Sequence, residues 1–138
     1  MAFLLDTVTV SEAGKRNADP SVVAWYKSKI GGELFISVLT ICEIRRGIAQ
    51  RRRRDPKAAD RLEQWLAVQR AFFADRILPV DEAVAECWGK LSPAMTLPVV
   101  DGLLAATAIV HGLTVATRNT RDFLLAGVSL VNPWDSAA

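Results

Sequence analysis

Four acidic residues lie where apolar segments of the chain end: Asp6, Glu43, Asp101 and Asp122. In a parallel sheet the strands end at one edge, so acids that are far apart in sequence can meet there. Carboxylate oxygens suit a hard divalent cation such as Mg²⁺ or Mn²⁺, and the chain offers no Cys/His set in their place. The acids therefore predict metal-assisted phosphodiester chemistry.

Strands and helices must alternate to bring these acids together. Strands are predicted at residues 3–5, 34–37, 77–80 and 113–117, and a final one at 128–131 would bring the sheet to five. Helices are predicted at residues 21–29, from 38 onward, at 57–73, from 82 to 91, at 102–110 and at 120–125. This order favours a three-layer α/β/α domain over residues 1–138, with a central, mainly parallel sheet of four or five strands.

Each acid also has an ordinary structural interpretation. Asp101 could simply cap the apolar helix that follows it. Asp6 could be a polar residue at the end of a strand, and Glu43 could be an exposed residue or could pair with Arg46. The residues alone leave these alternatives open.

Composition narrows the class of protein. No apolar stretch approaches the length of a membrane span, and the first residues lack a basic segment followed by a long apolar one, so a cytoplasmic protein without membrane contact is expected. Cys42 and Cys87 are too far apart for a CxxC motif and are predicted to be reduced thiols in the core.

Basic charge is concentrated in one segment. Six of the 17 basic residues are arginines between Arg45 and Arg54, although the formal net charge is only +2. Such a run is often a solvated helix end, but it could also contact the phosphates of a nucleic acid or dock a protein partner.

Four blocks of sequence resemble PIN-domain proteins of the VapC toxin family: residues 4–12, 37–47, 100–108 and 115–123. The closing segment Val-Asn-Pro-Trp at 131–134 is similar to the FitB-like subgroup of that family. The resemblance implies a PIN fold and a Mg²⁺- or Mn²⁺-dependent endoribonuclease, the toxin of a toxin–antitoxin pair.

The resemblance also implies roles for individual residues. Asp6, Glu43 and Asp101 match the metal-binding acids of the family, and either Asn119 or Asp122 matches a fourth position of the catalytic site. The implied partners are an RNA substrate such as a tRNA or another structured RNA, a VapB- or FitA-like antitoxin, and a second copy in a homodimer. DNA would be contacted only through the antitoxin.

The first block departs from the family pattern at one position. The pattern Leu-Asp-Thr-Asn has Val8 in place of the amide, which removes a side chain that could support the site through hydrogen bonds. An alternative is therefore a catalytically weak PIN-domain module that acts with its antitoxin in a DNA-binding, autoregulatory complex.

Overall fold

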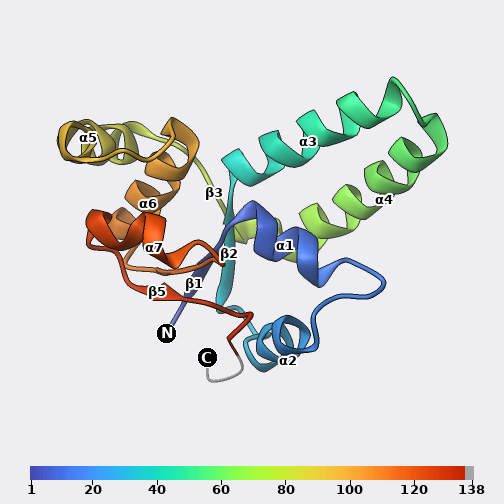
Figure 1. The fold of residues 1–138 in the computed structure, drawn as a ribbon, viewed down its shortest axis with the longest axis horizontal. Helices are drawn as coiled ribbons and strands as arrows, with labels where there is room; N and C mark the ends of the chain where they lie inside the picture. The colour runs from blue at the N-terminus through green and yellow to red at the C-terminus, as the bar shows by residue number, and fades with distance from the viewer. Residues whose placement is uncertain (136–138) are drawn as a thin grey trace.

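A five-stranded parallel sheet forms the centre of the molecule (Figure 1). The computed structural model describes residues 1–135, so residues 136–138 of the predicted domain lie outside the described part. The strand order is β3-β2-β1-β4-β5. The strands are β1 (Phe3–Leu5), β2 (Leu34–Ser37), β3 (Ile77–Leu78), β4 (Thr114–Ala116) and β5 (Leu130–Val131). The predicted α/β class and parallel sheet are confirmed.

Alternating side chains of the central strand build two hydrophobic cores. Phe3 and Leu5 belong to one core and Leu4 to the other, because successive residues of a strand point to opposite faces. The first core is covered by α1 (Thr7–Ala13), α2 (Pro20–Ser28), α3 (Val38–Arg52) and α4 (Pro56–Phe73). The second is covered by α6 (Val99–His111) and α7 (Thr120–Phe123), and α5 (Glu82–Leu91) packs on α6.

Local capping signals set most helix ends. Asp19, Asp55 and Asp81 each accept a backbone hydrogen bond at the start of α2, α4 and α5. Proline follows the first two of these caps, at the first helical position. Gly112 ends α6 in the left-handed conformation, with φ 66°, which glycine adopts without strain. These predicted boundaries are correct to within a residue or two.

The α3–α4 hairpin extends beyond the sheet (Figure 1). Ion pairs join its two helices: Arg45 pairs with Glu63, and Arg52 pairs with both Asp60 and Glu63. All four side chains are partly exposed, so each pair contributes little free energy by itself. The pairs nevertheless fix which arginines of the basic run face α4.

Three sequence expectations are corrected by the structure. Helix α1 was not predicted, and α6 begins at Val99 rather than after Asp101. The Cys42 thiol is exposed rather than buried, although both cysteines are free as expected. Ile109 and Val110, in the last turn of α6, are 39% and 40% exposed. No helix within residues 1–135 is long and apolar enough to cross a membrane.

Candidate active site

Asp6 is buried at the start of α1, directly after the central strand. Its Oδ1 accepts hydrogen bonds from the Thr9 backbone N–H at 2.8 Å and from Thr9 Oγ1 at 2.7 Å. Its Oδ2 accepts from Thr117 Oγ1 at 2.6 Å. Asp6 is therefore both the N-cap of α1 and an oriented carboxylate, and three hydrogen bonds leave part of its acceptor capacity free.

Thr117 connects Asp6 to the end of β4. Its hydroxyl oxygen accepts the Asn119 backbone N–H at 3.0 Å while its proton goes to Asp6. Thr9 Oγ1 also lies 3.0 Å from the carbonyl oxygen of Ala116 in the same strand. All of these groups except Asn119 are buried, so the Asp6 carboxylate has a defined orientation.

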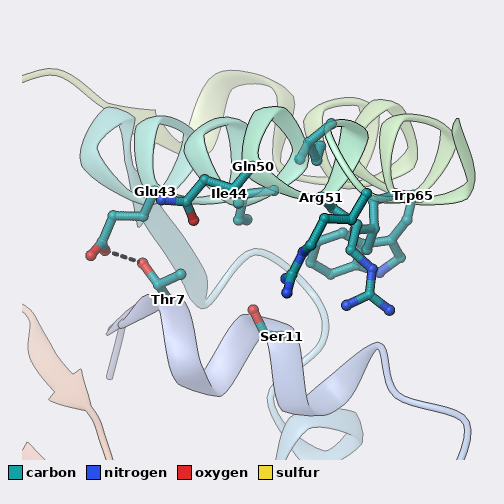
Figure 2. A pocket seen from close by; sticks show the side chains of 11 residues that line it. Thr7, Ser11, Glu43, Ile44, Gln50, Arg51 and Trp65 are labelled. Atoms are coloured by element: carbon teal, nitrogen blue, oxygen red, sulfur yellow. Dashed lines mark hydrogen bonds between the residues drawn. The ribbon is translucent and has the colours of Figure 1, made fainter. Parts of the chain in front are cut away.

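Glu43 lies on α3 and turns toward the start of α1 (Figure 2). Its Oε1 accepts a hydrogen bond from Thr7 Oγ1 at 2.5 Å, and Thr7 Oγ1 also lies 3.3 Å from Thr40 Oγ1. No ion pair with Arg46 is found among the described residues, whereas Glu43 is exposed, as its other ordinary interpretation expected.

Asp101 lies in the first turn of α6 and does not cap it, because Pro98 is the N-cap and Asp101 is already helical. The pKa of Asp101 is raised, first by burial and then by the negative charges of Glu43, Asp6 and Asp122. Asp6, Glu43 and Asp122 therefore lie close enough to Asp101 for their charges to affect it. Within residues 1–135 none of the four forms an ion pair with a Lys or Arg.

Asn119 and Asp122 both lie at the start of α7, and both are exposed. The Asp122 backbone N–H donates to the Asn119 carbonyl oxygen at 3.1 Å. The Asp122 carboxylate contributes to the raised pKa of Asp101, whereas the Asn119 side chain makes no hydrogen bond within the described part of the chain. Of these two residues, only Asp122 carries a charge that acts on Asp101.

This set of acids fits a divalent cation in charge and in atom type. The negative charges of Asp6, Glu43 and Asp122 act on Asp101 and are not balanced by an ion pair within residues 1–135, and carboxylate oxygens are the ligands that hard cations prefer. However, no group of three Asp, Glu, His or Cys side chains among residues 1–135 is arranged so that it could hold a metal ion. Coordination by more than two acids would require side chains such as Glu43 to turn from their present positions.

A pocket of about 330 Å³ adjoins Glu43, between α1 and the α3–α4 hairpin (Figure 2). Thr7 and Ser11 line it from α1, and Glu43, Gln50 and Arg51 from α3; its other lining residues are Ile44, Gly47, Ile48, Arg54, Leu62 and Trp65. Sequence reasoning did not place Ser11 or Gln50 there. It also missed the contact of Thr9 with Asp6.

Most of this chain matches a known family. The model of the PIN domain matches residues 3–127. The chain belongs to the PIN-domain family. The FitB-like resemblance noted from the sequence is also confirmed.

Relatives of this PIN domain include a toxin and a ribonuclease. The protein called Toxin FitB of Neisseria gonorrhoeae is 41% identical, over 96% of this chain and 98% of that protein. VapC ribonuclease Y4jK of Sinorhizobium fredii is 33% identical, over 98% of this chain and 99% of that protein. A solved structure of FitAB bound to an IR36 DNA fragment has a chain with TM-score 0.87 and 35% identity, covering 96% of both chains.

Proposed function

We propose that this PIN domain is a divalent-metal-dependent endoribonuclease, the toxin of a toxin–antitoxin pair. The observation that carries the proposal is topological: Asp6 directly follows β1, Glu43 lies on the helix that follows β2, and Asp122 lies on the helix that follows β4, all after neighbouring parallel strands. The charges of these three acids raise the pKa of Asp101, which supports the same site. The close relatives named as a toxin and as a ribonuclease support the same activity.

In this proposal Asp6, Asp101 and Glu43 hold Mg²⁺ or Mn²⁺, and Asp122 adds negative charge beside them. When bound, the cation would polarise a phosphoryl oxygen and lower the pKa of a water molecule. Thr9 and Thr117 keep the Asp6 carboxylate oriented. Thr7 donates a hydrogen bond to Glu43 in the metal-free protein. Asn119 supports the site through its backbone, which donates to Thr117.

Cleavage of RNA by the purified protein tests this proposal. A mixed RNA pool should be cut in Mg²⁺ or Mn²⁺ and left intact in EDTA. Asp101→Asn should abolish cleavage while the fold persists, because it removes a charged oxygen from the cluster and leaves a residue of the same size. Metal-independent cleavage, or full activity of Asp101→Asn, would contradict the assignment.

The partners proposed for this chain are a VapB- or FitA-like antitoxin, a second copy of the chain and, through the antitoxin, DNA. The solved FitAB structure on a DNA fragment supports the DNA contact by analogy. A cytoplasmic location is proposed together with an RNA substrate.

A second candidate is a catalytically weak module that acts mainly within the antitoxin–DNA complex. The observation that favours it is Val8, whose side chain is 49% exposed on α1 and offers no hydrogen bond near the acids. Under this candidate the purified protein would bind its antitoxin but would not cut RNA in Mg²⁺ or Mn²⁺. The cleavage assay therefore separates the two candidates.

A further inference from the structure

The six arginines of the basic run fall into three pairs in the structure. Arg45 and Arg52 form ion pairs with Glu63 and Asp60 on α4. Arg51 and Arg54 line the pocket beside Glu43, whereas Arg46 and Arg53 do not. Among residues 1–135, these last four arginines form no ion pair with a carboxylate. Three pairs of equal charge thus have three different environments.

The pocket-lining residues of this segment form one stripe. Glu43, Gly47, Gln50 and Arg51 follow one another along α3 at steps of four, three and one residue, and Arg54 comes three residues later, just beyond the end of the helix at Arg52; all five line the pocket. Figure 2 shows Glu43 and Arg51 on the side of α3 that faces α1. The rise of an α-helix places Arg51 roughly 12 Å from Glu43 along the axis. Cationic donors therefore begin about two helical turns from the acid cluster and lie in the same pocket as one of its members.

Gly47 keeps this stripe open between the acid and the arginines. A Cβ built at Gly47 would meet no atom within 4 Å, so packing does not require glycine at this position. Glycine in the middle of a helix costs stability relative to alanine. The open space at Gly47 leaves room for a bound ligand between Glu43 and the arginines.

We propose that the pocket between α1 and α3 holds the sugar–phosphate backbone of the RNA strand next to the bond that is cleaved, with Arg51 and Arg54 contacting phosphates. The proposal rests on the proposed function. Guanidinium groups bind phosphate oxygens through paired hydrogen bonds, and those of Arg51 and Arg54 are not occupied by carboxylates. Arg45 and Arg52 are excluded because their guanidinium groups bind α4.

A matched pair of double variants tests the assignment. Arg51→Gln with Arg54→Gln removes two charges from the pocket, and Arg46→Gln with Arg53→Gln removes two charges from the same segment outside it. Binding of a fluorescent single-stranded RNA of mixed sequence is measured by anisotropy in EDTA at several salt concentrations. The pocket variant should bind roughly tenfold more weakly, and its salt dependence should flatten by about 1.4 log units, or 0.7 for each lost phosphate contact.

The control variant should change both quantities much less, because its charges act only at long range. In Mg²⁺ or Mn²⁺ the pocket variant should raise KM and leave kcat nearly unchanged, since Arg51 and Arg54 position the strand and are not placed at the reacting atoms. Gly47→Gln should also weaken RNA binding, because its longer side chain would fill the open part of the pocket. Gly47→Ala should not, because a methyl group is small. Circular dichroism confirms that each variant is folded.

Each result decides between the proposals. If the wild type cuts RNA but the two arginine pairs have equal effects, the pocket assignment is wrong and the nuclease proposal stands. If the wild type does not cut RNA but the pocket variant alone loses RNA affinity, the nuclease proposal is wrong and the RNA surface stands. Loss of binding to a polyglutamate peptide without loss of RNA binding would show a protein-docking surface instead, and would overturn the assignment.

Discussion

Asp6 is the site residue that its surroundings orient most completely. It is 8% exposed and its two oxygens are bonded by Thr9 and Thr117, which come from different parts of the chain. Within residues 1–135, Asp6 Oδ2 accepts a hydrogen bond only from Thr117. The orientation of that oxygen therefore depends on a single hydroxyl group.

Replacing Thr117 by Val should thus lower metal affinity and RNA cleavage by roughly 10- to 100-fold, the range for groups that orient a metal ligand. Thr107→Val is the matched control, because Thr107 is equally buried but bonds the Leu103 carbonyl oxygen within α6. Both variants should lose about 1–3 kcal/mol of unfolding free energy. Equal activity of the two variants, measured by metal titration and cleavage assay, would refute the role of Thr117.

The charge of Asp101 should make the metal-free protein less stable as the pH rises. The pKa of Asp101 is raised from its ordinary value of 3.8, so between that value and the folded pKa the folded protein binds more protons than the unfolded chain. Stability falls over that window, and at neutral pH the ionised group is unfavourable because burial and three other acids oppose its charge.

Asp101→Asn should therefore raise the thermal midpoint at pH 7 in EDTA, and the gain should shrink as the pH approaches 3.8. Asp75→Asn, which changes an exposed acid outside the cluster, is the control and should have little effect. Thermal unfolding across this pH range checks the prediction. A gain that is the same at both ends of the range would disprove the electrostatic explanation.

At the scale of elements, helix-interior glycines have opposite structural roles in α3 and α6. The Cβ position of Gly47 is open, whereas a Cβ on Gly102 would lie 2.3 Å from the Trp88 ring of α5. Gly102 allows α5 and α6 to pack closely. Gly47 has no such steric reason.

Gly47→Ala should therefore stabilise the protein by roughly 0.5–1 kcal/mol, because alanine loses less backbone entropy in a helix. Gly102→Ala should destabilise it, since the Trp88 ring must move to admit the methyl group. Urea unfolding of both variants measures the difference. Destabilisation by Gly47→Ala would mean that this glycine has a packing role after all.

At the scale of the whole molecule, the acid cluster joins elements that are distant in the sequence. Asp6 precedes α1, Glu43 lies on α3, Asp101 on α6 and Asp122 on α7. A cation bound among them would connect the helices of both faces of the sheet and would bind only the folded chain.

Mg²⁺ or Mn²⁺ should thus raise the thermal midpoint of the wild type, by the equivalent of about 2.7 kcal/mol at a concentration about 100 times Kd. The Asp101→Asn variant should show little of this gain. KCl at matched ionic strength controls for simple screening of the acids. An equal shift in wild type and variant would argue against a site that includes Asp101.

The sequence by itself determined the elements that have strong local signals. Asp-Pro pairs at 19–20 and 55–56 and the glycine at 112 mark helix ends through the chemistry of one or two residues. The alternation of strands and helices determined the parallel sheet, and the position of acids at strand ends indicated the site. These features depend on residues that are close together in the chain, so they can be predicted from the sequence alone.

The tertiary structure decided what depends on distant partners. Residues 7–10 are all β-branched and disfavour a helix, yet α1 forms there because Asp6 caps it and Val10 packs in the core. Thr117 orients Asp6 across 111 positions of sequence. The division of the arginine run into ion-paired and pocket-lining residues depends on where α4 lies beside α3. The burial of Val10, the bond from Thr117 and the position of α4 are set by long-range packing and charge, which local sequence patterns do not encode.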